Sequence, residues 1–444
     1  MPTRELALLM AGTPMGVLRQ NSNGPLTFRY DRDYAANPRA TPLSLSMPVS
    51  DEDFRGRALT AFLWGLLPDN NEVLQRWGAR YGVSANNPFA LLANVGEDCA
   101  GAVQFVAPER IASLSPGGVS WLEESDLGDW VRQLREDPAA WLQSVEQGQF
   151  SLAGAQAKFA VAFHRGRWGR PYGAVPTTHI VKPASGRFAD QELTEHLSLR
   201  LADALGMVTA ESSIHEFDGE RVVVVKRYDR RFDGGQVRRI HQEDLCQALK
   251  VQPSGKYQSD GGPSPRDVVR LLRGAIAPSR ADQDVWRFVS ALALNWVIAG
   301  ADAHAKNYSL LLDGSQVRLA PLYDVVSGLP YFGAGNVRTQ RPGRLNPVNL
   351  RLAMSIGGTA VVREIDRLDW VRLATQLQLE ADRVIDRVAD IADRAPDAMA
   401  DVVRRESASE WKSRIPGQMV DGVAKQAVRC QEALRGRPLS ERHR

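Results

Sequence analysis

The chain contains few cysteines and carries almost no net charge. Its three cysteines among 444 residues, Cys99, Cys246 and Cys430, are far apart, which fits a reduced cytoplasm and no zinc site. The formal net charge of +3 at pH 7 is too small to indicate a nucleic-acid binder by itself. Because 444 residues exceed the usual single domain, we expect an enzyme-sized protein of two or three domains.

Long hydrophobic runs are also missing. The N-terminal segment MPTRELALLMAG has Glu5 inside its short apolar run and makes a poor signal peptide. The longest apolar run, Phe288 to Ala301, is too short to span a membrane and is interrupted by Ser290 and Asn295. We therefore expect a cytoplasmic protein without a membrane segment.

Neither Rossmann nor Walker glycine spacing occurs. Instead, the small-residue segment from Ser151 to Lys158 precedes the apolar run FAVAF, which predicts a tight turn between strands whose N–H groups could approach phosphates. One glycine between strands is more often only a turn. Lys158 could reach a phosphate or be an exposed strand lysine.

The segment 292–327 carries the clearest chemical pattern. A buried helix is predicted up to Ala301, followed by a polar loop and by two short strands joined at the hairpin dipeptide Asp313-Gly314. Asp302 and Asn307 are five residues apart, the interval of the kinase catalytic loop, and Asp324 follows the hairpin. Two carboxylates and an amide are suitable ligands and bases for magnesium-dependent phosphoryl transfer, although Asp-x-x-x-x-Asn alone could simply cap turns.

A phosphate-binding lysine is expected in the strand THIVKPA. Lys182 ends this strand, where a kinase needs such a lysine, and Glu192 opens the next helix, QELTEHLSLRLADALGM. Glu192 would hold the lysine and Glu195 is a second choice. Either acid could instead favour the helix N-terminus.

The β-branched strand Val222 to Val225 leads into Lys226-Arg227-Tyr228-Asp229. We expect a hinge there, with backbone groups offered to adenine and Tyr228 packing nearby. A buried strand running into a loop is the simpler interpretation, and both can hold.

Other segments predict local structure. Residues 4–30 indicate a small antiparallel sheet, Pro68 should separate two helices with Asp69 or Asn70 as a cap, and Ser125 is a plausible helix cap. IHQEDLCQALK is predicted to be a helix capped near Gln242, and the following Gly/Pro/Ser-rich segment QPSGKYQSDGGPSP is a long loop with a possible function. Helices are expected over 381–394 and 396–405. The basic residues 404–444 form either a solvated helix face or a contact for nucleic-acid phosphates.

Taken together, these segments resemble the HipA family of serine/threonine kinase toxins. The matching segments span nearly the whole chain: FLWGLLPDN (62–70), GEDCAGAVQF (96–105), SLAGAQAK (151–158), THIVKP (178–183), KRYDR (226–230), HQEDLCQAL (241–249), KYQSDGGPS (256–264), ADAHAKNYS (301–309) and LAPLYDV (319–325). The resemblance implies an α+β, two-lobed protein-kinase-like fold with an N-terminal α+β subdomain and a mostly helical C-terminal lobe. The expected boundaries are 1–112 for the N-terminal subdomain, 113–148 for a helical linker, 149–229 for the kinase N-lobe and 230–444 for the C-lobe.

The resemblance also implies roles for individual residues. Asp302 would be the catalytic carboxylate, Asn307 and Asp324 would bind Mg²⁺, and Ser151 would be autophosphorylated, with ejection of the loop and loss of activity. The residues expected to contact ATP are Ala153, Gly154, Ala155, Gln156, Ala157, Lys158, Lys182, Lys226, Arg227, Tyr228, His304, Ala305, Lys306 and Asn307. Lys226 stands in place of an acidic residue expected in relatives, and backbone contacts to adenine would survive that change.

The family's partners are implied in the same way. They are a small HipB-like helix-turn-helix antitoxin, operator DNA bound by the complex, and an aminoacyl-tRNA synthetase, typically glutamyl-tRNA synthetase, whose phosphorylation stalls translation. Two alternatives remain open: a small-molecule kinase of the aminoglycoside phosphotransferase type, and a catalytically silent DNA-binding corepressor. The Gly-Gly-Pro loop and the N-terminal subdomain count against the first. The intact set of Lys182, Asp302, Asn307 and Asp324 counts against the second.

Overall fold

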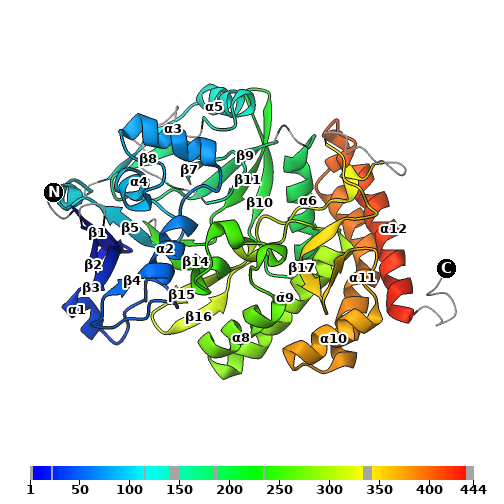
Figure 1. Ribbon diagram of the computed structural model, residues 1–444. Helices are drawn as coiled ribbons and strands as arrows, with labels where there is room; N and C mark the ends of the chain where they lie inside the picture. The colour runs from blue at the N-terminus through cyan, green and yellow to red at the C-terminus, as the bar shows by residue number, and fades with distance from the viewer. Residues whose placement is uncertain are drawn as a thin grey trace. The chain divides into compact units, whose positions relative to one another are not determined.

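A computed structural model describes residues 4–21, 24–114, 117–140, 151, 153–184, 186, 188–233, 236–333 and 343–436. The chain folds into two compact units (Figure 1). Unit 1 comprises residues 1–183, 215–256 and 309–320, and unit 2 comprises residues 184–214, 257–308 and 321–444. The segment after the catalytic-loop motif thus returns to unit 1 for its hairpin before it continues in unit 2.

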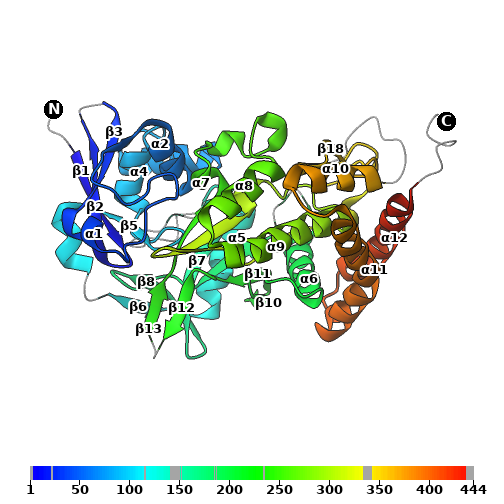
Figure 2. The same ribbon diagram turned by 90° about the horizontal axis from the view of Figure 1, so that it is seen from below.

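An antiparallel five-stranded sheet forms the N-terminal part of unit 1 (Figure 2). Its order is β4-β3-β2-β1-β5, from β1 (Arg4–Met10), β2 (Thr13–Gln20), β3 (Leu26–Tyr30), β4 (Phe54–Arg55) and β5 (Val103–Val106). The accompanying helices are α1 (Arg32–Ala36), α2 (Gly56–Gly65), α3 (Asn71–Tyr81) and α4 (Pro88–Val95). The predicted sheet over 4–30 and the break at Pro68 are confirmed, and the Asn70 side chain caps α3 by accepting a hydrogen bond from the Glu72 amide.

A six-stranded sheet of order β10-β11-β9-β7-β8-β6 forms the second part of unit 1. Its strands are β6 (Gly118–Trp121), β7 (Phe159–His164), β8 (Arg167–Tyr172), β9 (His179–Pro183), β10 (Ser212–Phe217) and β11 (Glu220–Lys226), and α5 (Glu124–Glu136) packs on it. The expected linker 113–148 therefore contributes a strand as well as a helix, while residues 141–150 lie outside the described part. The prediction that Ser125 caps α5 is wrong, because the cap is Glu123, whose amide donates to the Asp126 carboxylate.

Two smaller sheets complete unit 1, namely the ribbon of β12 (Arg230–Asp233) and β13 (Gln236–Arg239), and the sheet of β14 (His241–Asp244), β15 (Ser309–Asp313) and β16 (Gln316–Leu319). The hairpin predicted at Asp313-Gly314 is confirmed. The helix predicted for IHQEDLCQALK is wrong over its first half, because residues 241–244 pair with β15 and only α7 (Leu245–Ala248) is helical. Residues distant in the sequence stabilise this strand conformation. The imidazole of His241 lies within hydrogen-bond distance of Leu43 O, and Glu243 accepts a hydrogen bond from Ser44.

Unit 2 is mostly helical. It contains α6 (Gln191–Ala204), α8 (Pro265–Ala275), α9 (Pro278–Val297), α10 (Arg367–Leu377), α11 (Ala381–Arg405) and α12 (Ile415–Arg435), with a hairpin of β17 (Arg351–Ile356) and β18 (Thr359–Val361). Helices α11 and α12 lie side by side (Figures 1 and 2).

The predicted break in α11 at Pro396 is wrong. The helix continues through this proline because its buried stripe, which includes Ala392, Ala395 and Met399, runs unbroken on both sides and packs against α9 and α12. Of the basic C-terminal segment, residues 404–436 belong to the end of α11, a short connection and α12, while residues 437–444 lie outside the described part. Within the described residues, no helix is long and apolar enough to cross a membrane.

Candidate active site

The end of α9 determines where the polar loop begins. After the helix, Ala299 adopts a left-handed conformation (φ 51°) and the Gly300 amide donates to the Asn295 carbonyl at 2.7 Å. A Cβ atom on Gly300 would lie 2.3 Å from the Asn295 side-chain oxygen, so only glycine fits. The chain therefore leaves the buried helix abruptly and places Asp302 in an exposed position.

The loop from Asp302 to Asn307 is closed by hydrogen bonds to its own backbone. The Asp302 carbonyl accepts from the His304 amide at 2.8 Å and from Nδ2 of Asn307 at 2.8 Å, and the Asn307 amide donates to the His304 carbonyl at 2.9 Å. Because Nδ2 is engaged with the loop, Oδ1 of Asn307 is the atom that can ligate a cation. The five-residue spacing between Asp302 and Asn307 lets the Asn307 side chain close the loop on the Asp302 carbonyl.

Asp324 is placed by a different segment of unit 2. Two residues earlier, Leu322 bridges the 208–210 segment, donating to the Val208 carbonyl at 2.9 Å and accepting from the Ala210 amide at 2.8 Å. Asp324 itself has φ of 54°, a left-handed conformation. Non-glycine residues adopt this conformation rarely, and the cases that occur are concentrated at functional sites.

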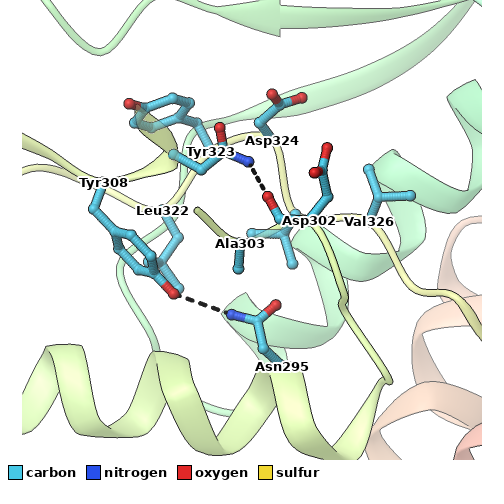
Figure 3. A pocket seen from close by; sticks show the side chains of 10 residues that line it. Asn295, Asp302, Ala303, Tyr308, Leu322, Tyr323, Asp324 and Val326 are labelled. Carbon is cyan, nitrogen blue, oxygen red and sulfur yellow. Dashed lines mark hydrogen bonds between the residues drawn. The ribbon is translucent and has the colours of Figure 1, made fainter. Parts of the chain in front are cut away.

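Asp302, Asn307 and Asp324 line one pocket of unit 2 (Figure 3). The pocket also contains Asn295 and Tyr308, whose side chains are joined by a hydrogen bond of 3.2 Å. Its volume is about 10 Å³, close to the space that one water-sized ligand needs.

This donor set fits Mg²⁺. The Asp324 carboxylate and the Asn307 amide oxygen are hard ligands that leave positions for water and phosphate oxygens. No group of three or more His, Cys, Asp or Glu side chains suited to a metal occurs in the described part of the chain. A cation in this pocket would therefore also need the Asn307 amide oxygen and oxygens from water or phosphate.

Three residues of the loop between Asp302 and Asn307 are buried. His304, Ala305 and Lys306 have little exposed surface, and Ala305–Asn307 forms a 3-10 turn. The Lys306 carbonyl accepts a hydrogen bond of 2.7 Å from the Tyr323 hydroxyl. Contact of these residues with nucleotide stays a prediction.

Sequence reasoning missed Tyr257. Its hydroxyl donates a hydrogen bond to Oδ1 of Asp302 at 2.5 Å, and it belongs to the long Gly/Pro/Ser-rich loop. Two signals in the sequence pointed to this region, the unusual loop and the family-matching segment KYQSDGGPS (256–264), but a tyrosine 45 residues from Asp302 belongs to no recognisable spacing.

The small-residue loop of unit 1 is folded back on itself. Gly154 has φ of 103°, and Nζ of Lys158 donates to the Ala153 carbonyl at 2.8 Å. The positive φ of Gly154, a conformation that other residues rarely adopt, explains the glycine. Lys158 is only 5% exposed, so its interpretation as an exposed strand lysine is wrong. Further along the loop, Nε2 of Gln156 donates to the Pro183 carbonyl at 3.2 Å.

Lys182 lies in β9 opposite Val223 and is 6% exposed, which excludes a solvated strand end. A lysine ammonium buried to this degree is stabilised by anionic or carbonyl groups. Glu192 and Glu195 are buried in the first turns of α6, in unit 2. The pairing of Lys182 with Glu192 stays a prediction.

The expected hinge is dominated by a buried ion cluster in unit 1. Asp98 lies 2.9 Å from Arg230, 3.2 Å from Arg239 and 3.6 Å from Arg227, and Arg227 also contacts Asp229 at 2.7 Å. Burial raises the pKa of Asp98, but the three guanidinium groups outweigh it and hold that pKa well below its usual range. Asp98 is therefore the centre of this cluster.

Arg227, in the expected hinge, belongs to this buried cluster. The Arg227 side chain is enclosed, and its amide donates to the Thr178 carbonyl at 2.9 Å; contact of Arg227 with adenine stays a prediction. Lys226 lies with Nζ 5.8 Å from the centre of the Phe232 ring, and the Tyr228 hydroxyl donates to Gln242. Contacts of Lys226 and Tyr228 with adenine stay predictions.

Ser151 is fully buried in unit 1. Its hydroxyl donates to the Leu66 carbonyl at 2.7 Å, and its amide donates to the Asp98 carbonyl at 3.1 Å. A phosphate group would not fit this enclosed position, so the serine must leave it before or upon modification.

Comparison with solved structures identifies the fold. A chain of the complex of HipA, HipB and operator DNA from Shewanella oneidensis superposes with a TM-score of 0.79 at 26% identity, covering 96% of this chain and 97% of that one. The predicted two-lobed, protein-kinase-like α+β fold is confirmed by this match.

Sequence comparison identifies the family. Residues 6–106 match the HipA N-terminal domain and residues 150–399 match the HipA-like C-terminal domain. Among relatives, "Putative kinase Y4mE" of Sinorhizobium fredii is 35% identical, covering 96% of this chain and 98% of that protein. The serine/threonine-protein kinase toxin HipA of Shewanella oneidensis is 31% identical, covering 82% of this chain and 81% of that protein. The chain belongs to the HipA family.

Proposed function

We propose that the chain is an ATP- and magnesium-dependent serine/threonine protein kinase. The observation that carries this proposal is the convergence of Asp302, Asn307 and Asp324 on one small pocket of unit 2. The relatives named as kinases support it. A protein without catalytic activity has no physical need for this donor set together with a buried Lys182.

Each residue has a role that follows from its chemistry. Asp302 is exposed beside the pocket, where a carboxylate can orient an acceptor hydroxyl and take up its proton. Asn307 and Asp324 would hold Mg²⁺, which neutralises charge on the transferring phosphoryl group when bound. Lys182 and the loop from Ala153 to Lys158 would bind the phosphates of ATP.

We extend the proposal to a toxin–antitoxin pair. The similar solved complex contains HipA, HipB and operator DNA, which supports a HipB-like helix-turn-helix antitoxin as partner and operator DNA bound through that complex. The family resemblance favours an aminoacyl-tRNA synthetase, such as glutamyl-tRNA synthetase, as the protein substrate. Phosphorylation of the synthetase would inhibit translation and arrest growth.

Ser151 is the proposed site of self-inactivation. In its buried position the hydroxyl is bound to the Leu66 carbonyl and cannot accept a phosphate without leaving. A phosphorylated Ser151 carries nearly two negative charges and would be strongly disfavoured there, so the segment before the Ala153–Lys158 loop would remain displaced.

The proposal is tested by incubating the unphosphorylated protein with labelled ATP and Mg²⁺, alone and with glutamyl-tRNA synthetase and its tRNA. We expect label on Ser151 in the chain alone, no label there in Ser151→Ala, and label on a synthetase serine in the mixture. Absence of transfer to any protein, despite ATP binding, would refute the kinase. Transfer to the chain alone would refute the synthetase as substrate and leave the kinase standing.

A further inference from the structure

The long loop of unit 2 places a tyrosine hydroxyl on the proposed catalytic carboxylate. The Tyr257 hydroxyl donates to Oδ1 of Asp302 at 2.5 Å. Hydrogen bonds to an ionised carboxylate are short and strong compared with those between neutral groups. Asp302 is otherwise an exposed aspartate, whose side chain would sample several rotamers in solvent.

The position of Tyr257 is set by groups other than Asp302. Its carbonyl accepts from the Asp260 amide at 3.0 Å and from the Gly262 amide at 2.9 Å, which closes a tight turn. Gly261 in this turn has φ of 83°, a conformation that favours glycine.

Two further contacts anchor the turn and the ring. The next residue, Gln258, exchanges two hydrogen bonds with Ser355 of β17, at 3.0 Å and 2.8 Å. The Tyr257 ring meets the His304 ring edge to face, with centroids 5.0 Å apart and planes at 86°. The hydroxyl is thus presented to Asp302 from a turn anchored on β17 and on the catalytic loop.

We propose that Tyr257 is a positioning residue for phosphoryl transfer, an inference that rests on the proposed kinase function. By binding Oδ1, it restricts the Asp302 carboxylate so that Oδ2 faces the acceptor hydroxyl. In the transfer step the acceptor oxygen bonds to the γ-phosphorus while the bond from that phosphorus to the ADP oxygen breaks. The acceptor proton passes to Oδ2 of Asp302, the bonding electron pair leaves on ADP, and Tyr257 keeps its own proton.

The test is Tyr257→Phe, which removes the hydroxyl and keeps the ring against His304. The initial rate of labelled phosphate incorporation into the full chain is measured at varied ATP with Mg²⁺. We expect kcat to fall about tenfold, because a misoriented base loses part of its positional advantage. The KM for ATP should stay within about twofold, since Tyr257 is not expected to contact nucleotide.

The matched control is Tyr34→Phe, which loses a hydroxyl bound to the Thr41 carbonyl in unit 1. It should leave kcat and KM unchanged. Tyr257→Leu, which also removes the ring from His304, should lower kcat at least as much as Tyr257→Phe.

The outcomes distinguish the positioning role of Tyr257 from the kinase function. An active wild type with Tyr257→Phe at equal or higher kcat overturns the positioning role and leaves the kinase intact. A loss accompanied by a matching rise in KM for ATP, or by a lower melting temperature, would also overturn it, because both indicate general damage. A wild type that incorporates no phosphate overturns the proposed function and this inference together.

Discussion

Replacing Asp98 by asparagine should destabilise unit 1 more than any surface change. Asparagine keeps the shape of the side chain but removes the charge that faces Arg227, Arg230 and Arg239. The buried guanidinium groups would then have Asp229 as the remaining carboxylate of the cluster. Breaking a buried ion pair by removing one partner costs about 3–5 kcal/mol, so we expect a loss of about that size.

Part of the local hydrogen bonding should survive this change. The Asp98 carboxylate accepts from the Thr177 amide at 3.0 Å and from its hydroxyl at 2.6 Å, and an asparagine oxygen can keep one or both contacts. The expected loss is therefore electrostatic. Because the pKa of Asp98 lies well below its usual range, the stabilisation is present above the unfolded-state pKa and is lost only as pH falls through acid values.

The assay is urea unfolding followed by tryptophan fluorescence, for the wild type, Asp98→Asn and a matched control. Asp233→Asn removes an exposed carboxylate that lies 3.7 Å from Arg238 and should change stability by less than about 0.5 kcal/mol. If Asp98→Asn costs less than about 1 kcal/mol, the reasoning from a buried charge cluster is refuted.

Two further predictions concern stability. Burial raises the pKa of Glu243 to about 8, despite hydrogen bonds from Ser44 and Leu45, so its protonated form is favoured in the folded state. The free energy of unfolding should fall by about 1.4 kcal/mol per pH unit as pH rises from the unfolded-state pKa towards 8, and Glu243→Gln should flatten this slope in urea titrations. An identical slope in the variant would contradict the assignment. Pro396→Ala should raise the melting temperature and increase the free energy of unfolding by up to about 3 kcal/mol, because alanine restores a donor inside α11; a lower melting temperature would contradict it.

Much of the fold could be predicted from local pattern. The N-terminal sheet, the break at Pro68 and the hairpin at Asp313-Gly314 each depend on residues close together in the sequence. The wrong predictions of secondary structure concern segments whose conformation depends on contacts with residues far away in the sequence. Residues 241–244 form a strand because they pair with β15, and α11 continues through Pro396 because its buried stripe is packed on both sides.

The same distinction between local and distant contacts applies to the residues of the candidate site. Asp302, Asn307 and Asp324 could be predicted because kinase spacing and a hairpin connect them within one segment, and they line one pocket. Tyr257 and the Asp98 cluster could not, because their partners come from segments separated by 45 and by more than 100 residues. The burial of Arg227 in this cluster could not be predicted either, and its contact with adenine stays a prediction.

The most direct test of the central claim is the single-turnover rate of γ-phosphate transfer in Asp302→Asn. The account predicts at least a hundredfold loss, since general-base catalysis contributes about 10²–10⁴-fold, with ATP affinity retained. Asp313→Asn, an exposed position in the β15–β16 hairpin of unit 1, should transfer phosphate at the wild-type rate. Transfer by Asp302→Asn within about tenfold of the wild type would contradict the role of Asp302 and with it the proposed phosphotransfer site.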